Sequence, residues 1–266
     1  MARYKFRSTP ASIAKRIAEG RGQGAGSHYR PWLEVHDFPS RGVIHRPLGA
    51  KTGRVHHLFS NLEFMLFLIY DVLACITDIR EQFPLLPLEE TLEIARELGV
   101  KHPTDPATRY PTVMTTDFLL KLEIQHQTLF HARAAKYGTD MDDSRLREKL
   151  SIEHCYWRRR DLNWGFITDK DVPPILAANA ALVHPFHLLS DLHPLNEKQV
   201  RRIAFYLNQR MRREELSLIN IVTGSDQKFD LPPGKSFTVV CHLIARNVWK
   251  VDLLKPISMN KRLILL

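Results

Sequence analysis

Two β-like runs in succession constrain the fold more than any other feature of this 266-residue chain. The segment "TDFLLKLEIQHQTLFHARAAK" carries apolar and β-branched residues on either side of the polar "QHQ". Such runs predict two strands, at about Val113–Ile124 and Thr128–Ala135. Asp117 stands at the start of the first run, and Lys136 ends the second. The first strand therefore begins with an acid, and the second ends with a cation.

A helix is predicted before these strands, with an acid in its first turn. In "SNLE", Ser60 fits the N-cap position and Glu63 the third position of a capping box, and an apolar run continues to Ile76. The other expected elements are a strand in "CITDIREQF" ended by Pro84, a helix in "PLEETLEIARELGV" stopped at Gly99, a helix capped near Asp143 or Ser144 and a strand in "NWGFIT". The core order is therefore helix, strand, strand, strand, helix, strand, with one extra helix after the first strand.

The prolines in "DKDVPP" predict a boundary between two domains, at residues 1–169 and 170–266. Residues 1–50 are rich in Gly and Arg, which predicts a basic arm or a surface layer with short strands. After the boundary, "NEKQVRRIAFYLNQRMRREE" predicts a basic helix and "VWKVDLL" a strand. The intervening "GKSFTVVCHLIARN" fits a helix, although "FTVV" could be a strand. Helices followed by a β-wing predict a smaller, mainly helical, winged-helix-like domain.

The net charge of +9 favours a polyanionic partner, which could be nucleic acid or an anionic membrane surface. Three scattered cysteines without CxxC spacing argue against a disulfide framework or a zinc finger and fit a reducing cytoplasm. No secretory signal is expected at the N-terminus, and the most apolar window, "LEFMLFLIYDVLACI", is too short to cross a bilayer. It predicts a buried helix.

The core order and its polar residues are typical of a restriction-endonuclease-like α/β domain with a mixed sheet flanked by helices. Glu63 and Asp117 would bind Mg²⁺, an ion that prefers oxygen ligands and keeps several waters. Lys136 would orient the attacking water or offset the charge of the transition state. Each residue also has a structural interpretation: Glu63 as a capping acid, Asp117 as a strand end, and Lys136 as a turn lysine. Taken singly, each structural interpretation is preferred, and the joint placement of all three adds weight to the catalytic interpretation.

Ala134 departs from this pattern, because residues 134 and 136 share a face of the strand and a methyl group cannot bind metal. The metal would then rest on Glu63, Asp117, waters and the backbone carbonyl of Ala135, with weakened affinity. Other clusters are discounted: the neighbouring histidines His56 and His57 should face opposite ways, and those at 184, 187 and 193 have no acidic or cysteine company. Phosphate-loop and serine-hydrolase motifs are missing from the sequence.

Several long phrases resemble the TnsA family, the endonuclease subunits of heteromeric cut-and-paste transposases. They are "AEGRGQG", "YRPWLEVHDFPSRG", "KTGRVHHLFSNLE", "DIREQFPLLP", "TTDFLL", "EKLSIEHCYW" and "FITDKD". The resemblance implies that Glu63, Asp117 and Lys136 are the catalytic residues, although the family motif Gln-Val-Lys stands here as Ala134-Ala135-Lys136. It also implies DNA contact by "GRGQG" and "KTGR", which contain Arg21, Lys51 and Arg54. His56 and His57, where phosphate contact or surface placement is favoured over zinc binding, are the other DNA-binding candidates.

The resemblance further implies a cytoplasmic, nucleoid-associated bacterial nuclease that uses Mg²⁺ or Mn²⁺ to cut the 5′ strands of double-stranded transposon ends. Its implied partners are TnsB, an integrase-type transposase that cuts the 3′ strands, and TnsC, an AAA+ ATPase regulator contacted through the C-terminal domain. Two alternatives stay open. One is a catalytically degenerate assembly factor that bridges transposase and ATPase, and the other is a free-standing restriction enzyme or junction resolvase.

Overall fold

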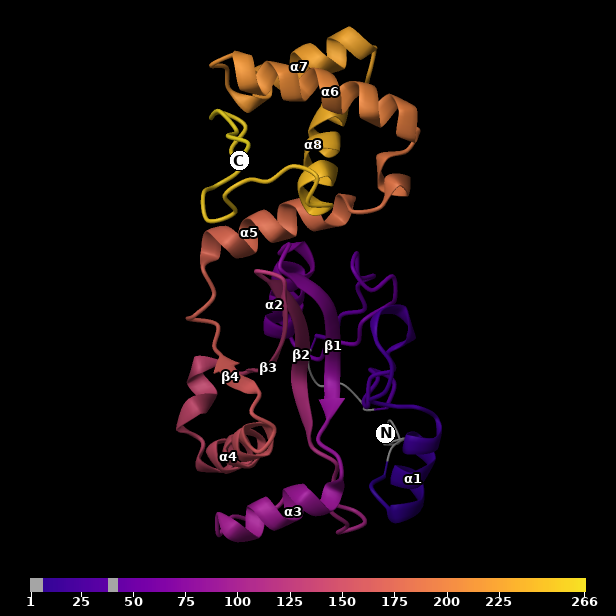
Figure 1. Ribbon diagram of the computed structural model, residues 1–266, viewed down its shortest axis with the longest axis vertical. Coiled ribbons are helices and arrows are strands. Elements are labelled where there is room, and N and C mark those ends of the chain that lie inside the picture. The colour runs from indigo at the N-terminus through magenta and orange to yellow at the C-terminus, as the bar shows by residue number, and fades with distance from the viewer. Residues whose placement is uncertain (1–6, 38–42) are drawn as a thin grey trace. The chain divides into compact units, whose positions relative to one another are not determined.

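The computed structural model describes residues 7–37 and 43–266 (Figure 1). The chain forms two compact units that alternate along the sequence. The first consists of Met1–Phe64 and Cys75–Asp171, and the second of Met65–Ala74 and Val172–Leu266. The expected division into residues 1–169 and 170–266 remains a prediction, because a ten-residue piece of the N-terminal sequence is assigned to the second unit.

A four-stranded mixed sheet forms the centre of the first unit, with the strands in the order β1-β2-β3-β4 (Figure 1). The strands are β1 (Ile76–Pro84), β2 (Thr115–Ile124), β3 (Gln127–Ala135) and β4 (Asn163–Ile167). The first three pair antiparallel, and β4 joins β3 in parallel. A parallel neighbour requires a crossover, which the helix between β3 and β4 supplies. The mixed sheet flanked by helices confirms the predicted fold class.

From residue 61 onward, the helices of the first unit follow the predicted core order. They are the start of α2 (Asn61–Val72), then α3 (Leu88–Glu97) and α4 (Ser144–Arg158), with short 3₁₀ turns at Gly26–His28 and Gly138–Asp142. Asp143 caps α4 by accepting a hydrogen bond from the backbone of Arg145. Ile152 and Trp157 on α4 pack against Leu119 of β2 and Ala132 of β3 in one buried cluster. This packing fixes α4 on the face of the strand pair that carries the candidate site.

The predicted N-terminal arm contains a helix that the sequence did not indicate, α1 (Pro10–Ala18). Thr9 and Ser12 form a capping box at its start, and Ile13 is buried against Trp32. Arg16 is also buried, and it pairs with Asp37 at 2.9 Å. One turn of apolar surface and a buried ion pair hold this segment in place. A single apolar turn is too short to show helical periodicity in the sequence. Residues 1–6 and 38–42, parts of the predicted arm and of "YRPWLEVHDFPSRG", lie outside the described residues.

The second unit is helical, as predicted, and Figure 1 shows its helices stacked around α8. They are α5 (Pro174–Val183), α6 (Glu197–Arg213), α7 (Leu218–Phe229) and α8 (Lys235–Ala245), with 3₁₀ turns at His184–Phe186 and Leu189–Leu192. "FTVV" lies in α8, so the helical interpretation of that segment is confirmed. The predicted strand at 248–254 is wrong. The amides of Val248 and Trp249 bond to the carbonyl of Leu243 as an extension of the α8 terminus.

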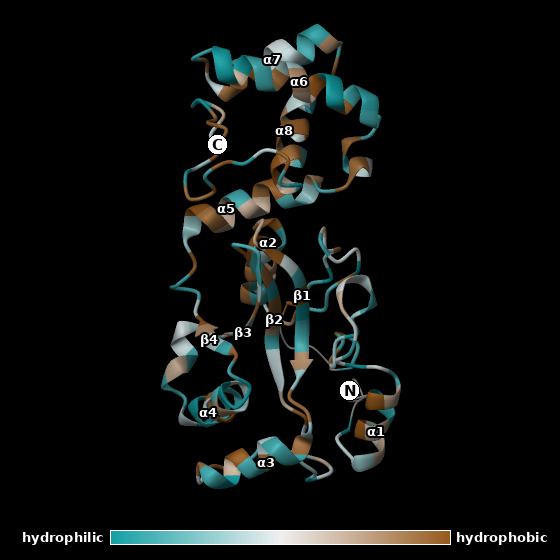
Figure 2. Cartoon of the chain, in the orientation of Figure 1, coloured by the Kyte–Doolittle hydropathy of each residue, from teal (hydrophilic) through white to brown (hydrophobic). Residues whose placement is uncertain are grey.

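The apolar run in α2 is buried, as predicted. Leu66 and Phe67 are almost fully covered, and Asp71 lies 2.8 Å from the ring of His184 inside the second unit. Figure 2 shows the brown, hydrophobic character of this helix. In the part of the chain that the structure describes, every helix is too short or too polar to pass through a bilayer.

The start of α8 depends on one buried carboxylate, that of Asp226. Its two oxygens accept hydrogen bonds of 2.7 Å from the backbone amides of Gly234 and Ser236. Asp226→Ala leaves the buried amide of Ser236 without a partner and removes the bond to the amide of Gly234, so we expect a loss of about 1–3 kcal/mol in the free energy of unfolding. Urea denaturation measures this loss. Glu215→Ala, at an exposed position before α7, is the control and should stay within about 0.5 kcal/mol of wild type.

Candidate active site

The predicted acid and cation of the strand pair lie in direct contact. The Lys136 amine is 2.6 Å from Oδ2 of Asp117, and the backbone amide of Ala135 donates to the same oxygen at 2.7 Å. Lys136 follows the last residue of β3 and is held there by a hydrogen bond from its amide to the carbonyl of Ile167 on β4. Antiparallel pairing of β2 and β3 brings the two side chains together. Asp117 Oδ1 accepts no hydrogen bond from the described residues, so this oxygen is available to a ligand.

Glu63 is buried at the start of α2 and is held by three donors. Ser60 Oγ donates to Oε1 at 2.9 Å, and the amides of Phe59 and Gln82 donate to Oε2 at 3.1 and 3.3 Å. The glutamate thus makes capping contacts, as the structural interpretation expects. Burial and the negative charge of Asp117 raise the pKa of Glu63 to about 7. This electrostatic coupling means that the capping acid also belongs to the charge cluster around Asp117.

Gln82 of β1 links Glu63 to the strand that bears Asp117. Its side chain donates to Glu63 and accepts a hydrogen bond of 3.0 Å from Thr115 on β2. The backbone of Gln82 has a φ of 48°, in the left-handed region that favours glycine. Such a conformation costs about 1–3 kcal/mol and is kept only where surrounding contacts enforce it. The carbonyl of Gln82 accepts from the amide of Trp32, which is one of these contacts.

The sequence did not single out a second glutamate, Glu153 of α4, as part of the site. It is buried, and its Oε1 accepts hydrogen bonds from Thr116 Oγ1 at 2.7 Å and from the indole of Trp164 at 2.9 Å. Burial and the charge of Asp117 raise the pKa of Glu153 to about 7. Its position among apolar residues of an amphipathic helix is the only signal in the sequence.

Lys136 therefore faces several acids. Burial alone would lower the pKa of its amine, but the charges of Asp117 and Glu153 and the hydrogen bond to Asp117 outweigh it, so the pKa is raised. Lys136 stays protonated at neutral pH, which suits it to stabilise negative charge rather than to accept a proton. Asp117, Lys136 and Glu153 also line a cavity of about 400 Å³, which gives a substrate access to this cluster.

The side chain of Ala134 is a buried methyl group, 1% exposed, and has no donor atom for a metal. Among residues 7–37 and 43–266, no three His, Cys, Asp or Glu side chains are grouped so that they could hold a metal by themselves. The donor set nevertheless suits a hard divalent cation. The carboxylates of Glu63, Asp117 and Glu153 surround the amine of Lys136, and burial together with the charge of Asp117 raises the pKa of both glutamates. Mg²⁺ bound through one or two carboxylates and several waters would relieve that repulsion.

Two of the five candidate DNA contacts are buried, contrary to expectation. Arg54 forms a bidentate pair with Glu81, at 2.7 and 2.6 Å, and the side chains are 10% and 0% exposed. His56 is fully buried between the same glutamate and Thr52, at 2.8 and 2.7 Å. Both side chains hold the segment before α2 against β1, and neither can reach DNA from these positions.

The other three candidates keep partial exposure. Arg21 pairs with Glu34 at 3.1 Å, and His57 accepts a hydrogen bond from the amide of Val35. Lys51 lies on a half-buried turn. Their DNA contacts stay predictions.

An acid near a strand start and a lysine at the end of the neighbouring strand of a mixed sheet, with a glutamate on the preceding helix, form the arrangement expected of a nuclease. Comparison with known proteins agrees. The family model described as TnsA-like endonuclease N terminal matches residues 74–169, which include Asp117, Lys136 and Glu153. The model described as TnsA endonuclease C terminal matches residues 171–253.

A curated relative extends the likeness to nearly the whole chain. The Escherichia coli protein named Transposon Tn7 transposition protein TnsA is 36% identical over 268 aligned residues, which cover 98% of this chain and 93% of the relative. The chain belongs to the TnsA family of endonucleases.

Proposed function

We propose that this chain is the subunit of a heteromeric DNA transposase that cuts the 5′ strands at transposon ends. The observation that carries the proposal is the contact of Lys136 with Asp117, beside the buried carboxyls of Glu63 and Glu153. The name of the Tn7 relative supports a role in transposition. An integrase-type transposase of the TnsB kind would cut the 3′ strands, and an AAA+ ATPase of the TnsC kind would regulate both, in the bacterial cytoplasm at the nucleoid.

Each residue has a defined task in the proposed reaction. Glu63 and Asp117, through its unbonded Oδ1, would hold Mg²⁺ or Mn²⁺, with the backbone carbonyl of Ala135 as a further oxygen. The bound ion would polarise the phosphodiester and lower the pKa of a water. The protonated Lys136 stabilises the negative charge that develops on the phosphate oxygens. Glu153, fixed by Thr116 and Trp164, adds a second negative charge near Lys136 and helps keep its amine protonated.

Strand mapping tests the proposal directly. A reaction reconstituted from this chain, a TnsB-type transposase, a TnsC-type ATPase and matching transposon ends should give 5′-strand cuts that depend on Mg²⁺ or Mn²⁺. If the 5′ strands stay intact in a reaction whose 3′ strands are cut, the proposed activity is excluded. Efficient cutting of plain duplex by the isolated chain would instead favour a free-standing nuclease.

The second candidate function is a catalytically degenerate assembly factor, favoured by the missing side-chain ligand at Ala134. Metal binding distinguishes the two. We expect calorimetry to show Mn²⁺ binding by the wild type, and we expect Glu63→Gln to weaken it by about tenfold or more, because a buried negative charge is removed. The control is Glu89→Gln, at an exposed position in the first turn of α3. Wild-type protein that binds no Mn²⁺ would support the assembly factor.

A further inference from the structure

The cavity at the candidate active site contains a second lysine that the proposed cleavage chemistry does not use. Of the described residues that line this cavity of about 400 Å³, two are cations, Lys136 and Lys149. Lys136 is paired with Asp117 at 2.6 Å. Lys149 is exposed, and it forms no ion pair within the described ranges 7–37 and 43–266. One positive charge at the cavity is therefore available to a bound anion.

The geometry of α4 places Lys149 at the cavity. Leu146, Leu150 and Glu153 line the same cavity, and the four positions recur at intervals of three or four residues, which puts them on one face of the helix. Leu150 and Glu153 are buried, so this face is held against the unit. A lysine four residues before a glutamate can pair with it, but the Glu153 carboxylate accepts hydrogen bonds from side chains of β2 and β4 instead. Lys149 therefore lies one helical turn from Glu153 without being neutralised by it.

An exposed lysine on a helix is ordinarily a solvated residue. Arg147 represents this ordinary case on the same helix, because it is exposed and does not line the cavity. Lys149 differs from Arg147 in lying next to the catalytic residues, where a positive charge acts on any strand that enters the site.

The negative charge of the site gives this cation a task. The phosphates of a DNA strand repeat about every 3.4 Å along the duplex axis, and each carries a negative charge. A strand whose cleaved phosphodiester lies at Asp117 and Lys136 therefore brings neighbouring phosphates toward the same carboxylates. A bound metal would offset this repulsion only at the phosphodiester that it contacts. Lys149, about 6 Å along the helix axis from Glu153, is placed to bind a phosphate beside it.

We propose that Lys149 binds a phosphate next to the cleaved phosphodiester, on the same strand, and thereby positions the cleaved bond at Asp117 and Lys136. The inference rests on the proposed function in taking this strand to be the 5′ strand of a transposon end. Lys149 contacts the substrate away from the bond that breaks, so it is a positioning residue. Its loss should slow the cutting of the 5′ strand without abolishing it.

A double-mutant cycle between the chain and its substrate tests the proposal. The reconstituted reaction is run with transposon ends that each carry one neutral methylphosphonate near the 5′ cut. Lys149→Met removes the charge and keeps an unbranched side chain of good helix propensity, so it should slow 5′ cutting by about tenfold. At one position the methylphosphonate should slow the wild type by a similar factor and slow Lys149→Met no further, because the contact is already lost.

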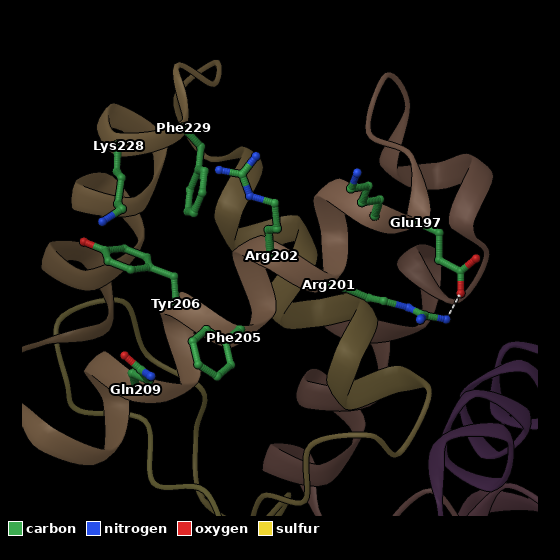
Figure 3. Close-up of a pocket in the computed structure, with 9 residues that line it drawn as sticks. Glu197, Arg201, Arg202, Phe205, Tyr206, Gln209, Lys228 and Phe229 are labelled. Carbon is green, nitrogen blue, oxygen red and sulfur yellow. Dashed lines mark hydrogen bonds and ion pairs between the residues drawn. The ribbon is translucent and has the colours of Figure 1, made fainter.

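Three control variants separate this contact from general effects of charge. Lys149→Arg keeps the positive charge and should retain most of the wild-type rate. Arg147→Met removes a charge from the same helix outside the cavity. Lys228→Ala removes one from the second unit, where Figure 3 shows this lysine over the ring of Tyr206, at 4.6 Å. Neither of the last two should couple to the methylphosphonate position that couples to Lys149. Cuts of the 3′ strand in the same reaction report that assembly is intact.

A second readout uses the wild-type chain and needs no cutting. In complexes assembled in EDTA, the DNA should protect the Lys149 amine from acetylation, as measured by mass spectrometry. One methylphosphonate of the series should restore the modification. Wild-type reactions that cut only the 3′ strands would exclude the proposed function, whereas the acetylation readout still tests the phosphate contact.

Three results would overturn the inference. Lys149→Met could cut the 5′ strand at the wild-type rate, its loss could multiply with that of every methylphosphonate, or the Lys149 amine could be acetylated equally with and without DNA.

Discussion

Asp117→Asn should abolish 5′-strand cleavage at transposon ends, by about 10³-fold or more, while complex assembly persists. The amide removes the charge that pairs with Lys136 at 2.6 Å and one of the proposed metal ligands. It can still accept the hydrogen bond from the backbone of Ala135, so the strand ends should stay in place. Strand mapping should show 3′ cuts alone, with products shifted toward cointegrates.

A neighbouring acid supplies the control for this substitution. Glu123 lies on the same strand, β2, at a partly exposed position beside Lys121 and Thr128. Glu123→Gln removes one negative charge from β2 without touching the site, so it should cleave like wild type. Persistence of 5′ cuts in Asp117→Asn would show that Asp117 is not a catalytic residue.

Glu81→Gln is expected to lower the free energy of unfolding by about 3–5 kcal/mol. Glu81 is fully buried, and it is the shared partner of Arg54 and His56. A neutral glutamine leaves the Arg54 guanidinium at 10% exposure without a counter-charge, which is the costly way to break a buried ion pair. Urea denaturation followed by circular dichroism measures the change.

Glu90 provides the comparison, because it forms a similar pair with Arg160, which follows the end of α4, at a more exposed position than that of Glu81. Glu90→Gln should cost less than about 1 kcal/mol. A loss of the same small size in Glu81→Gln would contradict the structural role assigned to the buried network.

The same glutamate determines a pH dependence. Burial alone would raise the pKa of Glu81, but His56 and the hydrogen bonds from Arg54 outweigh it and depress the pKa well below its usual range. A group whose pKa is lower in the folded state stabilises the fold above its unfolded pKa of about 4.3. That contribution is lost as the pH falls below about 4 toward the folded value. Stability should therefore fall less steeply with acidification in Glu81→Gln than in wild type.

The strand and helix order of the first unit was predictable because each element carries its own local signal. Asp143 caps α4, Gly99 ends the α3 segment, and the two apolar runs around "QHQ" form β2 and β3. Segments whose structure depends on distant contacts were not predictable. Helix α1 rests on Ile13 and on the pair of Arg16 with Asp37. Residues 248–254 contain strand-forming residues, but no neighbouring strand is available to pair with them among the described residues.

The candidate site was predictable only in part, for a similar reason. Glu63, Asp117 and Lys136 each stand at an element end, where residue type and spacing give a signal. Glu153 lies inside a helix, and its partners Thr116 and Trp164 come from β2 and β4. The burial of Arg54 and His56 was hidden as well, because basic residues in a Gly-rich loop have the composition of a phosphate contact. Only the fold shows that both side chains contact the buried carboxylate of Glu81.

The division of α2 between the two compact units has a practical consequence for anyone wishing to isolate the nuclease. Trimming the chain after residue 171 would keep Glu63 but strip the cover from Phe67 and leave Asp71 without His184. Such a fragment would expose the apolar residues of α2 that follow Glu63, and we expect it to aggregate. The first unit should therefore need the second to keep this helix covered.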